Sequence, residues 1–209
     1  MLIIPTVLSG LGFVFTLILI KRLTTLTRLV GLLFLLSLLS DLFAYFLYFQ
    51  FKVNPNYIVS LYLILSIPVY GLIYYQAYER RYKNFILAAT GGFLTFAVVN
   101  LLLIQRMTIN SYSNILLAVI VLTYALFYFY TLIKELPATH LLKLPMFWVN
   151  SAFIVYFSGN LSLFAFTTYL VNVLKNNLAF FWTTFHNLLG VIESVILIIA
   201  VWVDWKNEK

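Results

Sequence analysis

The stretch Leu178–Trp205 reads LAFFWTTFHNLLGVIESVILIIAVWVDW, and it decides the class of the fold. It is long enough to cross a bilayer, because a helical span needs about 20 mainly apolar residues. Its interior holds two titratable side chains, His186 and Glu193, which lie seven residues apart and therefore share one helix face. A carboxylate at that depth is costly unless a helix bundle receives it. The stretch therefore predicts one helix of a polytopic membrane protein, whose inward face is the first candidate site.

The composition of the whole chain favours the same class. Of the 209 residues, 64% are hydrophobic and 9% are charged, and the mean hydropathy is +1.02. The chain contains no cysteine, which excludes disulfides, thiolate metal sites and thiol nucleophiles. The net charge of +7 does not indicate nucleic-acid binding, because the basic residues stand in short turns between apolar runs. We predict a protein of the lipid bilayer with no cofactor and no nucleic-acid partner.

Seven apolar runs are long enough to span a membrane, and charged or turn residues bound each of them. The first run lacks the positive leader and the cleavage site of a signal peptide, so we expect it to stay as a helix. Every connection is short, so residues 1–209 are predicted to form one all-α, seven-helix transmembrane domain. The predicted helices cover residues 2–20, 29–51, 57–78, 84–105, 111–133, 146–170 and 178–203.

Basic residues predict the orientation of the bundle. The loops after the first, third and fifth runs, with the C-terminal segment, hold ten Lys and Arg, whereas the opposite loops hold three. This bias places the N-terminus outside and the C-terminus inside. The sequence also leaves open a parallel repeat of three helices, one linker helix and three more. Residues 19–21 and 132–134 both read LIK, and SDL at 40–42 resembles GNL at 159–161, although apolar segments also match by chance.

Polar side chains at bilayer depth are expected to face the interior of the bundle, because lipid offers no hydrogen bonds. In the second and third runs, polar side chains recur every three or four residues and so form one stripe on each helix. The sixth and seventh runs add Asn, His and Glu side chains near their middles. If the four helices meet, these groups form one buried polar centre. The candidate ligand- or proton-binding residues are Asp41, Tyr45, Ser66, Tyr70, Asn150, Asn160, His186 and Glu193.

Two roles are open for these residues. The Asn, Ser and Tyr side chains are expected to tie helices together by interhelical hydrogen bonds, each worth about 0.6 kcal/mol. A functional role stays open for Asp41 and Glu193, because an acid in mid-membrane costs roughly 2.5 kcal/mol or more. No retinal site is predicted, since no lysine occurs between Lys175 and Lys206. Two histidines do not suffice for a histidine-rich metal site, and no nucleophile elbow, zinc-protease motif or phosphate loop is present.

Four short segments carry a family resemblance. They read NSYS at 110–113, PMFWVN at 145–150, YFSGNL at 156–161 and WTTFHN at 182–187. Together they resemble a family of short, uncharacterised bacterial seven-transmembrane proteins of the sensor-kinase-associated type. The resemblance covers mainly the last three helices and implies a sensor of the bacterial inner membrane with no catalytic residues. At 66–68 this chain reads SIP where the resemblance leads us to expect an acidic residue.

The first functional hypothesis is a non-enzymatic receptor or sensor subunit with its pocket around Asp41, Tyr70, Asn160 and Glu193. Its ligand would be a small molecule or a lipid, and signalling would require a membrane partner or a second copy of the chain. The alternative is a small-solute transporter, in which Asp41 and Asn160 hold matching positions in two three-helix halves. A lipid-modifying enzyme is the third hypothesis. The acid, base and nucleophile that it requires are not visible as a set, although Asp41, His186 and Glu193 would supply two of them.

Overall fold

The apolar runs form seven α-helices in the computed structural model, which describes residues 3–52, 56–79, 81–105, 111–135, 140–174 and 178–207. Side chains are described in these ranges except at 3, 56, 57, 164, 166–174 and 178–183. The predicted all-α, seven-helix class is confirmed. The helices are α1 (Ile3–Leu19), α2 (Thr25–Phe51), α3 (Asn56–Ala77), α4 (Lys83–Val99), α5 (Ser111–Glu135), α6 (Pro145–Leu174) and α7 (Leu178–Asn207).

Six helices are long and apolar enough to cross a membrane in the described part of the chain. The set counts only residues whose side chains are described, and helix α6 is described in part. Large apolar side chains are exposed along the other helices, an arrangement that a water-soluble monomer rarely tolerates. The protein is therefore an integral membrane protein. The six spans are Ile4–Arg22, Thr25–Phe51, Ile58–Ala77, Lys83–Ile104, Ser111–Glu135 and Thr184–Asn207.

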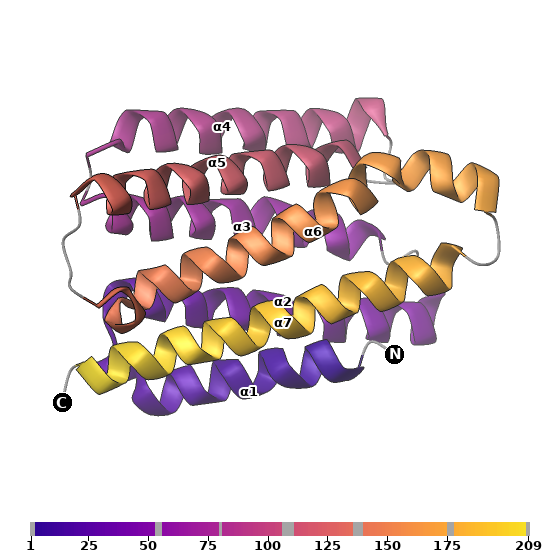
Figure 1. The fold of residues 1–209 in the computed structure, drawn as a ribbon. Coiled ribbons are helices and arrows are strands. Elements are labelled where there is room, and N and C mark those ends of the chain that lie inside the picture. The colour runs from indigo at the N-terminus through magenta and orange to yellow at the C-terminus, as the bar shows by residue number, and fades with distance from the viewer. Residues whose placement is uncertain are drawn as a thin grey trace.

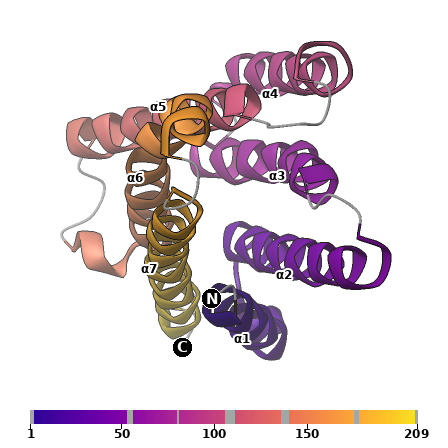
Figure 2. The same cartoon turned by 90° about the vertical axis from the view of Figure 1, so that its right-hand side faces the viewer.

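Six of the helices form a closed ring. Going round it, α1, α2, α3, α5, α6 and α7 each contact the next, and α7 returns to α1. Helix α4 packs mainly against α3 and α5, outside the ring (Figure 2). Figure 1 shows that α1 begins and α7 ends at opposite ends of the bundle. We call these ends the N side and the C side, and side chains that face the middle of the ring can meet from several helices.

Small residues let α1 and α2 approach closely. A Cβ atom on Gly31 of α2 would overlap the methyl group of Thr16 on α1. A Cβ atom on Gly12 of α1 would come within 2.7 Å of the Phe34 ring on α2. Helix pairs in membranes depend on such close contact, because lipid supplies no hydrophobic force between them. The α1–α2 pair is therefore held mainly by packing in its C-side half.

The C-side half of the ring is filled by side chains that have almost no exposed surface. The largest are Tyr74 of α3, Tyr124 of α5 and Phe153 of α6, with the branched residues Val149 of α6 and Val201 of α7 beside them. The ring centroids of Tyr74 and Tyr124 lie 5.2 Å apart. Buried rings in contact gain stability beyond the area that they bury. This packed layer closes the ring toward the C side.

Helices α6 and α7 extend four residues past their predicted ends, to Leu174 and Asn207, and the start of α2 and the end of α4 also differ from the prediction. Helix α2 begins at Thr25 rather than at 29, where the carboxylate of Asp204 accepts hydrogen bonds from Thr24 and Thr27. Helix α4 ends at Val99 and continues as one π-helical turn, Asn100–Ile104, in which the Gln105 backbone N–H donates to the Asn100 carbonyl at 2.9 Å. At the start of α2 the contact comes from a side chain of α7, and after α4 the turn follows a local hydrogen-bond pattern; the apolar pattern encodes neither.

Candidate functional site

Helix α7 has one face exposed to lipid and one face toward the ring. Its exposed stripe repeats every seven residues at Leu188, Val195 and Trp202, which are 53%, 44% and 46% exposed. Successive residues of an α-helix are rotated by about 100°, so a residue two positions before Val195 points to the opposite side. His186 and Glu193 both lie opposite the exposed stripe. The prediction that these two residues share an inward face agrees with this pattern.

Glu193 is an inward-facing acid without a hydrogen-bond partner. On the same face of α7, Leu197 and Ala200 are only 4% and 0% exposed, whereas Glu193 is half-buried. Within the described residues, the Glu193 carboxyl makes no hydrogen bond and no ion pair. Its remaining exposed surface therefore lies on the ring side of α7, where neighbouring side chains do not cover it.

Three tyrosine hydroxyls lie within electrostatic range of the Glu193 carboxyl. Tyr62 and Tyr70 come from α3, and Tyr156 comes from α6. The Tyr70 hydroxyl is within hydrogen-bonding reach of the Tyr62 hydroxyl. The Tyr70 ring is buried edge-on against Phe153 of α6, with ring centroids 5.0 Å apart. Helices α3, α6 and α7 therefore bring polar groups to one place inside the ring.

Asp41 of α2 lies near the same tyrosines as Glu193, but its carboxyl has a hydrogen-bond partner. The Thr6 hydroxyl of α1 donates to Asp41 Oδ2 at 2.7 Å. Asp41 is half-buried and lies within electrostatic range of Tyr62 and Tyr156, two of the tyrosines that Glu193 also reaches. The two acids thus act on shared neighbours from two helices, α2 and α7, that also contact each other. We call Asp41, Tyr62, Tyr70, Tyr156 and Glu193 the acid–tyrosine cluster.

Asn160 and His186 form a polar pair next to this cluster. Asn160 is fully buried, and its Nδ2 donates to the Tyr156 carbonyl at 2.9 Å. Its Oδ1 lies 2.8 Å from His186 Nδ1. Because an amide oxygen can only accept, the proton of this hydrogen bond belongs to His186 Nδ1. The imidazole ring also lies 5.8 Å from the Tyr156 ring, so the pair holds Tyr156 between α6 and α7.

No Lys or Arg side chain offsets the two acids. The sequence has no Lys or Arg within residues 29–51, 56–78, 145–174 or 178–205, which supply the cluster and its surroundings. The charge of the cluster is therefore set by Asp41 and Glu193 alone. A carboxylate in a medium of low polarity is stable only with a countercharge or with good hydrogen bonds.

Three predicted site residues, Ser66, Asn150 and Tyr45, make no contact with the cluster that the structure shows among the described residues, although Ser66 stands between Tyr62 and Tyr70 on one face of α3. The Ser66 hydroxyl donates to the Leu63 carbonyl of its own helix at 3.2 Å. Asn150 lies in the packed C-side layer, where it accepts from the Tyr74 hydroxyl at 2.7 Å and donates to the Ala125 carbonyl at 2.9 Å. These bonds make Asn150 a tie between α3, α5 and α6.

Tyr45 was expected on the inward stripe of α2, and the structure corrects this placement. Its side chain is 64% exposed, and its ring packs against Phe49 of the same helix with centroids 4.3 Å apart. The physical reason is that large side chains are exposed on every face of α2 from Leu42 to Phe51. A stripe that is inward in the first half of the helix is therefore exposed in the second half.

The structure adds three residues that the sequence analysis did not include among the candidates. Tyr62 lies one step further along the four-residue stripe of α3, and Tyr156 stands four residues before Asn160. Both four-residue spacings can be read from the sequence. Neither shows whether the tyrosine makes a polar contact or only packs against its neighbours. Thr6 had no signal at all, because its role depends on how α1 crosses α2.

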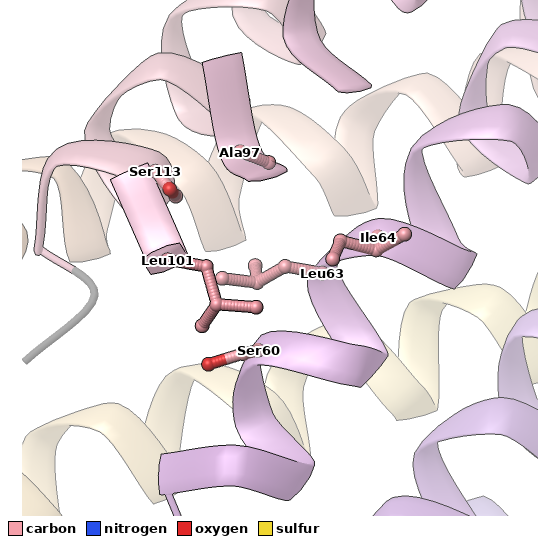
Figure 3. Close-up of a pocket in the computed structure, with 6 residues that line it drawn as sticks. All are labelled: Ser60, Leu63, Ile64, Ala97, Leu101 and Ser113. Carbon is pink, nitrogen blue, oxygen red and sulfur yellow. The ribbon is translucent and has the colours of Figure 1, made fainter. Parts of the chain in front are cut away.

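A separate pocket lies outside the acid–tyrosine cluster, and the described part of the chain holds no candidate metal site. This shallow pocket, without room for a water molecule, lies between α3, α4 and α5, on the far side of α3 from α2 (Figure 3). The described residues hold no group of three or more His, Asp or Glu side chains that would bind a metal ion. The pocket shares no residue with the acid–tyrosine cluster, and it is lined by Ser60, Leu63, Ile64, Ala97, Leu101 and Ser113.

Comparison with known protein families, with curated proteins and with solved structures gives no match to this chain.

Proposed function

We propose that this protein is a membrane receptor or sensor subunit that binds a small ligand at the acid–tyrosine cluster and signals through a partner protein. The observation that carries the proposal is the contrast between two levels of the ring. At the C side, Tyr74, Phe153 and Val201 are packed without accessible surface. Toward the N side, Asp41 and Glu193 are half-buried although both belong to the ring interior.

This contrast supports a site that is reached from one side of the membrane. Along α7, Glu193 precedes Val201, and along α6 Tyr156 follows Phe153, so the cluster lies on the N side of the packed layer. A carrier has to expose its site to each side in turn, whereas a receptor needs access from one side only. The packed C-side layer therefore favours a receptor.

Signalling by such a bundle runs through contacts with another protein. The described residues lie almost entirely in helices joined by short connections. A ligand that binds between α2, α3, α6 and α7 would favour one arrangement of these helices over another, and a bound partner would detect the difference.

The test uses the absence of natural cysteines, which makes each introduced thiol the only one in the chain. Glu193→Cys places a thiol in the cluster, and Val195→Cys places one at nearly the same depth on the lipid face. Membrane-impermeant thiol reagents are applied to vesicles of each orientation. We expect Glu193→Cys to react from one side only and Val195→Cys not to react, because a thiol in hydrocarbon does not form the reactive thiolate.

Labelling of Glu193→Cys from both sides would contradict the receptor proposal. His186→Cys repeats the measurement at a second inward position, in case the first variant fails to fold. In parallel, the intact protein is isolated from its native membrane under mild detergent. A partner in stoichiometric amount supports signalling by contact, and its absence after chemical cross-linking argues against it.

A small-solute transporter is the second candidate, supported by the position of α4 outside the ring. The ring then consists of α1–α3 and α5–α7, two sets of three helices with the same directions in the chain. Asp41 and Asn160 come from the middle helix of each set. Solute uptake by the purified protein in liposomes, lost in Asp41→Asn, would favour this function over a receptor.

A further inference from the structure

We infer that the acid–tyrosine cluster binds a small organic cation, with Glu193 as its countercharge and the tyrosines as its walls. The inference rests on the ligand site proposed above and adds the chemical class of the ligand. Three observations carry it: two acids without a Lys or Arg nearby, the lack of a hydrogen-bond partner for Glu193 within the described residues, and the tyrosines within electrostatic range of it.

The charge balance of the site favours a positive ligand. Two carboxyl groups, Asp41 and Glu193, face shared tyrosines, and the surrounding helical stretches contain no Lys or Arg. An anionic ligand would meet like charge in a medium of low polarity and would be strongly disfavoured. A cation supplies the charge that the protein itself does not place there.

The two acids are not equivalent, and the difference identifies Glu193 as the main anchor. Asp41 already accepts a hydrogen bond from Thr6 at 2.7 Å. Within the described residues the Glu193 carboxyl accepts none, although it faces the ring and keeps accessible surface. A buried acid that lacks a protein partner is costly to maintain, so its retention is explained best by a partner that comes from outside.

The walls of the site suit an organic cation better than a metal ion. Tyr62, Tyr70 and Tyr156 lie within electrostatic range of Glu193, and tyrosine side chains interact favourably with ammonium groups. Calcium and magnesium need about six oxygen ligands, and no group of three or more acidic or histidine side chains occurs among the described residues. An alkylammonium or protonated amine matches this combination of one unpartnered carboxylate and several tyrosines.

The first experiment measures thermal stability of the detergent-solubilised protein with defined probes. The cations are choline, methylammonium, tetraethylammonium and phenethylammonium, and the control ligand is the neutral analogue of choline in which a tert-butyl group replaces trimethylammonium. We expect at least one cation to raise the Tm, while the neutral analogue does not. In Glu193→Gln, which keeps the size of the side chain, the affinity for that cation should fall by about tenfold or more. The matched control is Glu79→Gln, at an exposed turn, which should bind as the natural protein does.

The second experiment needs no knowledge of the natural ligand. In His186→Cys, the single thiol lies two helical turns from Glu193 on the same face of α7. Its reaction rates are measured with a cationic and an anionic methanethiosulfonate reagent of similar size. We expect the cationic reagent to be favoured, and the ratio of the two rates to fall by about tenfold when Glu193→Gln is added.

The outcomes separate the ligand class from the receptor function. If no cation raises the Tm and the rate ratio is the same with and without Glu193, the inference is overturned. If the neutral analogue binds as well as choline, the site binds a ligand, but the inferred ligand class, an organic cation, is wrong. Neither result bears on the receptor proposal. That proposal is tested separately, by one-sided labelling of the introduced thiol and by recovery of a stoichiometric partner.

Discussion

The carboxylate of Asp204, near the end of α7, caps the start of α2 through Thr24, a residue 180 positions away in the chain. It accepts from the Thr24 backbone N–H at 2.8 Å and from the Thr24 hydroxyl at 3.0 Å. The Thr27 hydroxyl, one turn into α2, donates to the same oxygen. A negative group at a helix N-terminus satisfies unpaired N–H groups and interacts favourably with the helix dipole. This contact fixes the C-side end of α7 against the turn between α1 and α2.

Removal of the Asp204 cap is expected to destabilise the bundle. Asp204→Ala should lower the free energy of unfolding by about 2 kcal/mol, because several buried donors lose their acceptor. Asp204→Asn should lose less, since its amide oxygen still accepts. Thermal or denaturant unfolding in detergent micelles measures the difference. If Thr27→Val adds its full cost on top of Asp204→Ala, the hydroxyl and the carboxylate do not act as a pair.

The close contact between α1 and α2 is expected to reject even one methyl group. Gly31→Ala would place its Cβ atom on the Thr16 side chain and should lower stability, by roughly 1 to 3 kcal/mol. The matched control is Gly91→Ala on α4, where nothing lies within 4 Å of the new atom. That change should be neutral or slightly stabilising, because alanine favours a helix more than glycine does. Partial recovery in Gly31→Ala with Thr16→Ser would show that the Thr16 methyl group causes the loss, whereas equal effects at both glycines would refute it.

The buried tie between α3 and α6 is expected to make a small but measurable contribution. Tyr74→Phe removes the donor to Asn150 and should cost about 1 kcal/mol of unfolding free energy. The control is Tyr130→Phe, because Tyr130 is exposed and makes no hydrogen bond within the described residues. The comparison is made by unfolding both variants in the same detergent. A loss in Tyr130→Phe as large as in Tyr74→Phe would show that the hydroxyl of Tyr74 has no special role.

The unpartnered acid on α7 is expected to cost stability. Glu193→Leu should raise the free energy of unfolding, by roughly 1 to 3 kcal/mol, because it removes an acid from the membrane interior. The same variant should lose ligand response, a trade-off that is common at functional sites. Val195→Leu, on the lipid face two residues away, is the control and should change neither property. A Tm of Glu193→Leu below that of the natural protein would show that Glu193 stabilises the fold instead.

The number and order of the helices were predictable from the sequence. The thickness of the bilayer sets the length of a span, and charged residues are favoured in the turns outside it. The predicted limits of the third helix, 57–78, differ by one residue at each end from the observed Asn56–Ala77. The start of α2 differs by four residues from the predicted one, and the cap that Asp204 supplies there comes from the far end of the chain. The π-helical turn at Asn100 likewise follows from a local hydrogen-bond pattern that apolar periodicity does not encode.

The candidate site was predictable as a set of helix faces, and the contacts between those faces were not. Helical spacing placed His186 and Glu193 on one face, and the seven-residue lipid stripe of α7 agrees with that placement. The spacing of residues within one helix does not show how far neighbouring helices are shifted along each other. That shift determines that Asn160 hydrogen-bonds to His186, whereas Asn150 hydrogen-bonds to Tyr74. The same shift leaves Tyr45 exposed although it shares a stripe with Asp41.

The pairing of Asp41 with Thr6 has a consequence for how the protein is made. Synthesis proceeds from the N-terminal side, so α1 and α2 enter the bilayer long before α7 has been translated. Asp41 therefore finds its partner within the first helical hairpin and does not wait in lipid for the remaining helices. Glu193 has no such early partner, and it arrives in the final helix, when the surrounding tyrosines are already in the membrane. The order of insertion thus spares the nascent chain a long exposure of either acid to hydrocarbon.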